Sequence, residues 1–272
     1  MAALDLHSHG GGEGPPVTLL HGFTTHSGAW EAIQRQLERR YRVLAIDLPG
    51  HGRSPAPPPN YDFAACVDDL IAHVVRSGNA AGALVGYSMG GRIALAMSLR
   101  APELITRLVL ESASPGIEDP AARAARRADD AALANDLEAG DLVAFMDRWQ
   151  SQPLFHTLRR LDAEVLARAR ALRLGNDKFS LSAALRALGT GSQPSYWNAL
   201  ADMLTPTLLV TGEWDDKFDR IAREMHARLP ASSRSVVAGA GHTTHLENPD
   251  GFLACVLPFL ADTAVTEQAV AG

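Results

Sequence analysis

The sequence contains no long uninterrupted hydrophobic run. No stretch approaches the ~18 apolar residues that a membrane-spanning helix needs, and residues 1–14 do not place an apolar block after a basic start, as a secretory signal would. These absences argue against a membrane span and against export. We therefore expect a cytoplasmic protein, in which His7 and His9 lie on a solvated, mobile N-terminal arm.

Cysteine is scarce, and positive charge is not in excess. Cys66 and Cys255 lie in apolar, helix-like contexts without metal-ligand spacing, so we expect buried thiols rather than a disulfide or a metal site. The net charge of -6 argues against nucleic acid as a partner. The expected partner is a small molecule, and recognition of an anion must come from a local cluster of arginines.

Short apolar runs alternate with amphipathic helical patterns at both ends of the chain. Strands are expected at residues 17–20, 42–46, 83–85, 107–111, 207–211 and 235–238. The helices between them are expected at residues 30–39, 63–76, 92–99, 220–229 and 252–260. Apolar strands in such alternation are typical of an α/β fold, in which a mostly parallel, doubly wound sheet is covered by helices on both faces.

Strand signals stop between residues 114 and 202. This block contains only Ala-, Leu- and Arg-rich helical patterns, interrupted by glycine and proline. An all-helical block of this length inside an α/β frame is interpreted as a lid inserted over the ends of the strands. We therefore divide the chain into a first core segment at 1–113, a helical lid at 114–202 and a second core segment at 203–272.

Residues 86–90 read Gly-Tyr-Ser-Met-Gly and stand between a predicted strand and a predicted helix. A Gly-x-Ser-x-Gly motif in this context indicates a nucleophile elbow, a sharp turn that presents Ser88 at the N-terminus of the helix. Arg92 does not fit the same pattern, because the helix dipole disfavours a cation in the first turn by about 0.3–1 kcal/mol. Its position raises the question of which anion it meets.

Two later segments supply partners for the Ser88 hydroxyl. Serine becomes a nucleophile or a base only when an imidazole takes its proton and a carboxylate orients that imidazole. Asp215 follows one predicted strand and His242 follows the next, so the three residues occur in the chain order of an α/β-hydrolase triad. Asp216 and Glu111 are alternatives for the carboxylate.

The imidazole and the oxyanion hole rest on shorter motifs. His245 is an alternative to His242, although a Gly-x-Gly-His turn after a strand favours His242. The backbone N–H groups of Met89, directly after the serine, and of Phe23, at the end of a Leu-His-Gly-Phe segment, are predicted to form the oxyanion hole. His21 in that segment is interpreted as a residue that braces the loop.

Together these motifs resemble the α/β-hydrolase superfamily over nearly the whole chain. More narrowly, the sequence resembles the 2-succinyl-6-hydroxy-2,4-cyclohexadiene-1-carboxylate (SHCHC) synthases of menaquinone biosynthesis. The elbow and triad motifs occur in many hydrolases, whereas Tyr87, Arg92 and the lid pattern are narrower signals. The matching stretches are residues 20–23, 86–92, 111–116, 125–127 with Asp130 beyond, 149–153, 212–218, 239–242 and 247–249.

The resemblance implies a lyase rather than a hydrolase. In that family a cyclohexene with a succinyl arm and an enolpyruvyl ether loses a ring proton and expels pyruvate, without an external cofactor or metal. Ser88 would meet the substrate proton, with His242 and Asp215 raising its basicity. The oxyanion hole would hold the enolate-like charge on the succinyl ketone oxygen.

The resemblance also implies a pocket with several arginines. This substrate carries several carboxylates, and planar guanidinium groups suit carboxylates well. By match to the family, Arg92, Arg126 and Arg173 would bind the carboxylates, and Tyr87 and Trp149 would line the pocket.

Other interpretations compete with these expectations. Arg168 and Arg170 are alternatives to Arg173. In another interpretation, the solvated face of an Ala-rich helix is formed by Arg123, Arg126 and Arg127. An ordinary serine hydrolase, acting on an ester or a C–C bond, would use the same triad with water. The two functions differ in their pockets, because a neutral ester needs an apolar slot rather than inward-facing arginines.

Overall fold

The structure is a computed structural model that describes residues 3–262. Within these residues seven strands form one sheet in the order β1-β3-β2-β4-β5-β6-β7. All neighbouring strands run parallel except β1, which is antiparallel to β3. The predicted α/β fold with a mostly parallel sheet is confirmed. The strands are β1 (Ser8–His9), β2 (Pro16–Leu20), β3 (Arg42–Ile46), β4 (Gly82–Tyr87), β5 (Ile105–Glu111), β6 (Thr207–Gly212) and β7 (Ser232–Val237).

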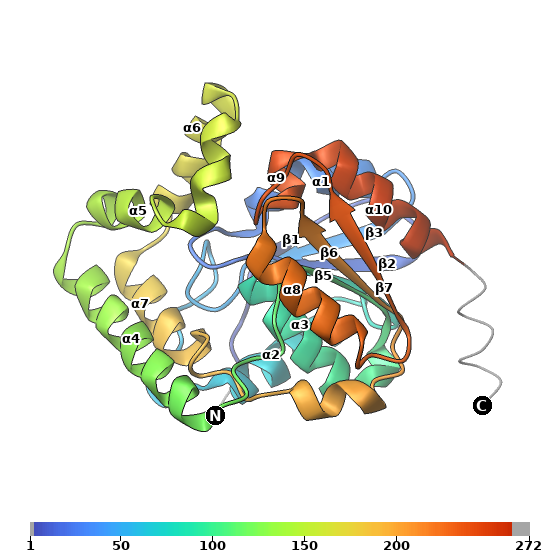
Figure 1. Cartoon of the computed structure of the whole chain (residues 1–272), viewed down its shortest axis with the longest axis horizontal. Coiled ribbons are helices and arrows are strands. Elements are labelled where there is room, and N and C mark those ends of the chain that lie inside the picture. Colours follow the sequence, from blue (N-terminus) through green and yellow to red (C-terminus); the bar gives the residue numbers. More distant parts are fainter. Residues whose placement is uncertain (1–2, 263–272) are drawn as a thin grey trace.

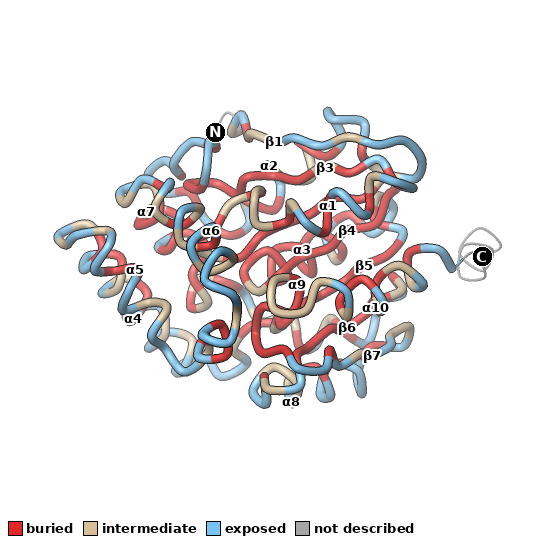
Figure 2. Tube along the Cα trace, turned by 90° about the horizontal axis from the view of Figure 1, so that it is seen from above, coloured by how far each residue is buried: buried red, intermediate tan, exposed pale blue. Residues whose placement is uncertain are grey.

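Helices cover both faces of the sheet (Figure 1) because side chains alternate between the two faces of each strand. In β2, Val17 and Leu19 belong to one hydrophobic core and Leu20 belongs to the other. The strands β2 to β6 are buried along most of their length (Figure 2), whereas the edge strands β1 and β7 are mostly not buried. The first core lies beneath α1 (Glu31–Leu37) and α10 (Pro249–Ala261), and the second beneath α2 (Phe63–Arg76), α3 (Met89–Arg100) and α8 (Asp216–His226). Shorter elements are η1 (Ser27–Trp30), η2 (Pro102–Leu104) and α9 (Thr244–Glu247).

The strands and helices predicted for the core are present, with shifts at their ends. Two of these shifts have a local cause. The helix α8 begins at Asp216 rather than at residue 220, because the Asp215 side chain accepts a hydrogen bond from Phe218 N and caps the helix. The strand β7 begins at Ser232 rather than at residue 235. Its first residues are polar and lie at the edge of the sheet, where only one side is paired, so an apolar run does not mark where the strand begins.

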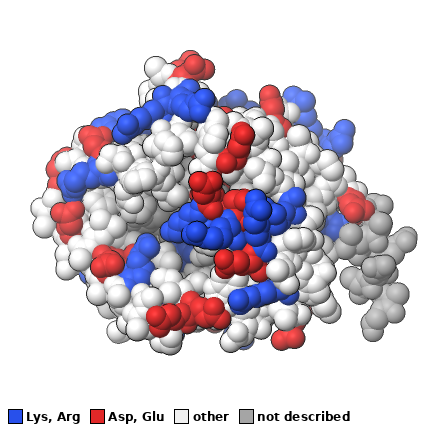
Figure 3. Space-filling view, in the orientation of Figure 1, with Lys and Arg blue, Asp and Glu red and all other residues white. Residues whose placement is uncertain are grey.

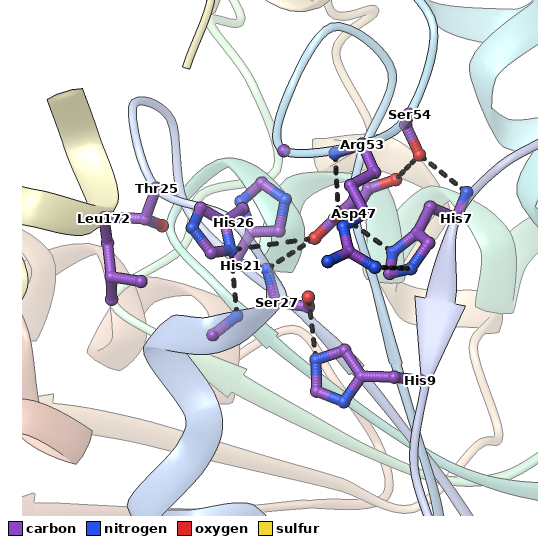
Figure 4. A network of polar contacts seen from close by, with 12 residues as sticks. His7, His9, His21, Thr25, His26, Ser27, Asp47, Arg53, Ser54 and Leu172 are labelled. Atoms are coloured by element: carbon purple, nitrogen blue, oxygen red, sulfur yellow. Dashed lines mark hydrogen bonds and ion pairs between the residues drawn. The ribbon is translucent and has the colours of Figure 1, made fainter. Parts of the chain in front are cut away.

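The prediction of a mobile N-terminal arm is wrong. Residues 8–9 form β1 and pair with the end of β3. His7 Nδ1 lies 3.1 Å from an Asp47 oxygen, and His9 Nε2 lies 3.0 Å from Ser27 Oγ (Figure 4). A strand of two residues is too short to leave a periodic pattern in the sequence, so only its tertiary contacts reveal it.

Asp47, directly after β3, is the centre of this polar network (Figure 4). Its buried carboxylate accepts hydrogen bonds from Ser27 N at 2.8 Å and from Arg53 N at 2.9 Å, besides its contact with His7. Burial alone would raise the pKa of this carboxyl, but the hydrogen bonds outweigh burial and lower the pKa to about 2. The charge of Asp47 therefore ties the segment after β2 to the segment after β3.

Residues 114–202 contain helices and no strand. The helices between residues 120 and 188 stand to one side of the sheet (Figure 1), whereas Trp197 and Leu200 pack into one of the sheet's hydrophobic cores. Asn176 fastens this block to the core, because its side chain donates to Thr24 O and accepts from Gly52 N. The boundaries 1–113, 114–202 and 203–272 remain a proposal, and residues 263–272 lie outside the described range. The helices of the block are α4 (Pro120–Ala139), α5 (Leu142–Gln150), η3 (Pro153–Arg160), α6 (Ala163–Leu174), α7 (Lys178–Leu188) and η4 (Trp197–Asp202).

Both cysteines are free thiols, as expected. Cys66 is buried between α2 and its neighbours, and Cys255 is partly buried on α10. Burial raises the pKa of the Cys66 thiol, so this sulfur stays protonated near neutral pH. In the range 3–262, no helix is long and apolar enough to cross a lipid bilayer.

We expect Asp47→Asn to lower the free energy of unfolding by about 2 kcal/mol at pH 7, which corresponds to a carboxyl pKa held at about 2 instead of 3.8. Because the folded-state pKa is the lower one, this stability is present above about pH 4 and is lost as the pH falls towards 2. Urea unfolding at pH 7 and at pH 3 measures both effects. Asp68→Asn, which removes an exposed carboxylate paired with Arg100, is the control. Equal losses in the two variants would contradict the central role of Asp47.

Candidate active site

The turn between β4 and α3 presents Ser88 at the edge where the parallel strands end. Ser88 has φ 50° and ψ -108°, a strained conformation for a residue with a side chain. A Cβ on Gly86 would lie 2.5 Å from Gly90 O, and one on Gly90 would lie 2.3 Å from Leu20 O. Only glycine fits at both positions, so the motif folds into the sharp turn that it predicts.

Ser88, His242 and Asp215 form one hydrogen-bonded series. Ser88 Oγ lies 3.1 Å from His242 Nε2, and His242 Nδ1 lies 2.8 Å from Asp215 Oδ2. Asp215 follows β6, His242 follows β7, and both are buried. In this arrangement Asp215 accepts a hydrogen bond from the protonated Nδ1 of His242. The other ring nitrogen, Nε2, carries no proton and can take the proton of the Ser88 hydroxyl.

The alternative triad residues Asp216, Glu111 and His245 do not take part in this hydrogen-bonded series. Asp216 is exposed in the first turn of α8. Glu111 is fully buried, but its carboxylate contacts His245 Nδ1 at 2.8 Å and not His242. The Nδ1 atom of His245 is therefore hydrogen-bonded to Glu111 and not to a residue of the series. The structure therefore brings together the carboxylate and the imidazole that the sequence favours.

Asp215 has a second side-chain partner, which the sequence analysis missed. Ser112 Oγ donates to Asp215 Oδ2 at 2.9 Å, and Phe218 N donates to Oδ1 at 3.4 Å. Ser112 stands immediately after β5, with φ 46°. The one available signal was a polar residue directly after a buried strand, and that signal is shared by too many loops to be specific.

The segment after β2 lies against the serine. A Cβ on Gly22 would stand 3.6 Å from Ser88 Cβ, which places this segment beside the hydroxyl. Phe23, the next residue, and Met89, the first residue of α3, both line the cavity above Ser88. The two predicted donors of the oxyanion hole therefore belong to the two segments that border the serine, and both residues line its cavity.

Three hydrogen bonds hold that segment in place. His21 Nε2 accepts from Leu48 N at 2.9 Å, and His21 Nδ1 donates to Gly22 O at 2.8 Å. Burial lowers the pKa of His21 to about 4, so this ring is neutral near pH 7 and acts as a brace. Thr24 has φ 71°, and Asn176 Nδ2 donates to its carbonyl oxygen at 2.9 Å.

A cavity of about 590 Å³ opens above Ser88, between the core and the helical block. Arg168 and Arg170 do not line it; they are exposed and pair with Glu31 and Asp147. On the face shown in Figure 3, Lys and Arg side chains are interspersed with Asp and Glu side chains, so no single charge dominates that surface. The residues expected to bind substrate all line the cavity: Tyr87, Arg92, Arg126, Trp149 and Arg173.

Arg92 and Arg173 are buried cations without a carboxylate partner among residues 3–262. Arg92 donates to Leu188 O at 2.9 Å and to Gln193 Oε1 at 3.1 Å. Arg173 donates to Ala169 O, and its buried Nε has no hydrogen-bond partner. Burial lowers the pKa of Arg92 to about 10 and also lowers that of Arg173, yet both guanidinium groups stay protonated near pH 7.

The unusual position of Arg92 has a structural explanation. Leu188 is the last residue of α7, so the Arg92 side chain caps the negative end of that helix. The cation opposes the dipole of its own helix and complements the dipole of a helix in the lid. Gln193, which holds the other side of the guanidinium group, left no signal in the sequence.

The other two lid residues expected to bind substrate, Arg126 and Trp149, contribute a paired cation and an aromatic ring. Arg126 is half exposed, and its Nε donates to Asp130 Oδ1 at 2.7 Å. Trp149 packs edge-on against Phe23, with 5.2 Å between the ring centroids. The cavity therefore combines cationic groups with an aromatic wall above the serine.

Residues 15–249 match the family described as the alpha/beta hydrolase fold. Curated relatives carry the name 2-succinyl-6-hydroxy-2,4-cyclohexadiene-1-carboxylate synthase. The Enterobacter sp. (strain 638) protein is 36% identical over 249 residues, which cover 90% of this chain and 92% of that protein. A Bacillus subtilis (strain 168) protein, which carries the same name provisionally, is 39% identical over 261 residues, which cover 91% of this chain and 92% of that protein.

Solved structures show the same likeness. MenH from S. aureus has a TM-score of 0.87 at 34% identity, and the match covers 96% of this chain and 98% of that chain. An enol-lactonase from Burkholderia xenovorans LB400 has a TM-score of 0.82 at 22% identity, over 95% of this chain and 97% of that chain. At this identity the lactonase shows a shared fold alone. The match to MenH extends over the helical block as well as the core, because it covers nearly the whole chain.

We expect Gly90→Ala to disturb Ser88 far more than the fold as a whole. The new Cβ would lie 2.3 Å from Leu20 O and 2.5 Å from His21 O, in the segment that lies against the serine. Labelling of Ser88 by a fluorophosphonate should slow by about 100-fold, because small displacements at a reacting group are costly. Gly175→Ala is the matched control, since its Cβ would meet nothing closer than 3.5 Å. Unchanged labelling of folded Gly90→Ala would show that this position does not need glycine.

Proposed function

This chain belongs to the SHCHC synthases, within the α/β-hydrolase fold, and from that premise we propose that it catalyses the reaction for which those relatives are named. The product is 2-succinyl-6-hydroxy-2,4-cyclohexadiene-1-carboxylate, an intermediate of menaquinone biosynthesis. The substrate is 2-succinyl-5-enolpyruvyl-6-hydroxy-3-cyclohexene-1-carboxylate, which loses pyruvate. The protein is thus a carbon–oxygen lyase built on a hydrolase fold. We propose that it acts in the cytoplasm.

The observation that carries this proposal is the cationic lining of the cavity above Ser88. Arg92 and Arg173 are buried there without a carboxylate partner in the described part of the chain, and Arg126 stands beside the same space. A desolvated guanidinium group is costly unless an anion pairs with it. A substrate with several carboxylates supplies such anions, whereas a neutral ester would leave the cations unpaired. The lining therefore supports the lyase over an ordinary esterase.

In the proposed mechanism Ser88 is the base of the elimination. His242 Nε2 takes the hydroxyl proton of Ser88 while Asp215 holds the opposite side of the ring, so the serine oxygen can accept the ring proton beside the succinyl ketone. The electron pair of the broken C–H bond moves onto the ketone oxygen and then through the ring. It finally breaks the bond between the ring carbon and the enolpyruvyl oxygen. The departing enolpyruvate takes up a proton and becomes pyruvate, and no cofactor takes part.

Negative charge develops on the ketone oxygen during this elimination. We assign its stabilisation to the backbone N–H groups of Phe23 and Met89, and the close approach of Gly22 to Ser88 supports this assignment. Donors that are in place before the reaction stabilise the transition state without having to reorganise. Trp149 and Tyr87, which line the same cavity, would pack against the ring of the substrate.

Ser88→Ala tests the proposed base. The wild-type protein should release pyruvate from the enolpyruvyl substrate and form the conjugated diene. The variant should lose this activity by about 100-fold or more, because its proton acceptor is gone. A coupled pyruvate assay, diene absorbance and thermal unfolding together measure activity and fold. Rapid ester cleavage without any pyruvate from the wild type would identify a serine hydrolase instead, and full activity in Ser88→Ala would remove Ser88 as the base.

Arg92→Ala tests the carboxylate site. Loss of one charge-assisted contact should lower kcat/KM for the elimination by roughly 10- to 150-fold. Cleavage of p-nitrophenyl acetate, a small neutral ester, should change by less than about threefold. The ester also detects general damage to the site, since Arg92 caps α7. Arg168→Ala is the matched control, because Arg168 pairs with Glu31 outside the cavity. Equal losses on both substrates would rule out a carboxylate role.

A further inference from the structure

A second buried carboxylate–histidine pair lies beside the proposed triad. Glu111, the last residue of β5, is 0% exposed. Its carboxylate accepts hydrogen bonds from His245 Nδ1 at 2.8 Å, from His245 N at 3.0 Å and from Thr244 Oγ1 at 2.7 Å. All of these donors belong to the start of α9, the short helix that follows His242. The sequence left Glu111 as an alternative triad acid, and the structure gives its carboxylate this other partner.

The main chain around Glu111 is tied to the other triad residues. Glu111 O accepts a hydrogen bond from Ser88 N at 2.9 Å. The next residue, Ser112, donates its hydroxyl to Asp215 Oδ2 at 2.9 Å. Residues 111 and 112 therefore contact the segments that carry all three triad side chains, although these segments are separate loops of the fold.

The pair lies outside the cavity above Ser88, although His245 lines a second cavity of about 210 Å³ that shares Tyr87 and Arg173 with it. Neither Glu111 nor His245 lines the cavity above Ser88. The His245 ring is buried against Trp30 and Tyr87, with centroid distances of 4.3 and 4.9 Å. An effect of this pair on the reaction must therefore pass through the residues that it holds.

Two carboxylates hold the loop that carries His242: one bonds only within the loop, and the other bonds it to the central sheet. Glu247 accepts from Gly241 N and Thr243 N, so it stabilises the loop only within itself. Glu111 connects the same loop to a strand of the central sheet. Of these two carboxylates, Glu111 is the one that joins the loop to another element of the fold, and the Tyr87 hydroxyl adds a second link, 2.8 Å from Thr243 Oγ1.

We infer that Glu111 is a positioning residue, which sets the place of His242 relative to Ser88 by holding residues 244–245 against β5. A carboxylate removed from water holds its donors firmly, because the release of any donor would leave a buried charge underpaired. Proton transfer between His242 and Ser88 depends on their separation and alignment. The inference rests on the triad role in the proposed function and gives Glu111 a role other than that of triad acid.

Glu111→Gln tests this inference. Glutamine is nearly isosteric, but its single carbonyl oxygen can serve only one side of the site. Its NH2 group then faces either His245 Nδ1–H or the donors Thr244 Oγ1 and His245 N, and it cannot accept a hydrogen bond from them. We expect kcat for pyruvate release to fall at least about tenfold, with KM within about twofold of the wild type, because the arginine-lined cavity is untouched. In 15N-histidine-labelled protein, the Nδ1–H signal of His242, assigned by its loss in His242→Gln, should shift or broaden. This signal reports the geometry of His242 and Asp215 without any substrate.

Asp69→Asn is the matched control. Asp69 is also a buried carboxylate, and it accepts from Tyr61 Oη and Leu4 N outside the site. This variant should lower the Tm without changing kcat or the His242 signal. Wild-type kcat and a wild-type His242 signal in folded Glu111→Gln would overturn the inference.

A further variant covers the case in which Glu111→Gln does not fold. Thr244→Val removes one of the donors to Glu111 and should lower kcat at least about threefold, with the same change in the His242 signal. An unchanged kcat and signal in this variant would overturn the inference equally. If the wild-type protein releases no pyruvate, the proposed function fails, and the NMR comparison still decides the positioning role.

Discussion

The close packing of main chain around Ser88 is the constraint on which the site depends. Ser88 has a positive φ, and glycine at positions 86 and 90 lets β2, β4 and the start of α3 approach to distances that no side chain would allow. The parallel strands end at one edge of the sheet, so the segments that follow β2, β5, β6 and β7 meet above the serine. For this reason Ser88, Asp215 and His242 are distant in the sequence and adjacent in space.

The helical block adds charge to this scaffold. Arg173 comes from α6, and Arg92, from the core, reaches the carbonyl end of α7, so the two parts of the chain share one cavity. Within residues 3–262, the atoms that accept hydrogen bonds from these two cations are all neutral: the carbonyl oxygens of Leu188 and Ala169 and the amide oxygen of Gln193. Buried cations that keep part of their hydrogen-bonding capacity are prepared for an anionic ligand. A fold shared with many hydrolases thereby becomes suited to a substrate with several carboxylates.

Patterns within short stretches of the sequence made much of the core predictable. Contacts between residues that are distant in the chain leave no pattern in the sequence. Apolar strands and the Gly-x-Ser-x-Gly motif depend on neighbouring residues, so their pattern is legible in one short window. The elements β1 and α9, with two and four residues, are too short to show a period. Ser112 and Gln193 matter only because they hold Asp215 and Arg92, which lie 103 and 101 positions away in the chain. No local pattern can contain such a pairing.

The sequence by itself determined the fold class, the elbow and the order of serine, aspartate and histidine, because these follow from the residues at the ends of successive strands. Tertiary structure decided which arginine of α6 faces the cavity. Arg168, Arg170 and Arg173 lie within two turns of one helix, and the packing of that helix against the core turns Arg173 inward and leaves the other two in exposed ion pairs. Tertiary structure likewise decided which buried carboxylate meets which histidine, since that depends on the distance between strand ends and not on their order in the chain.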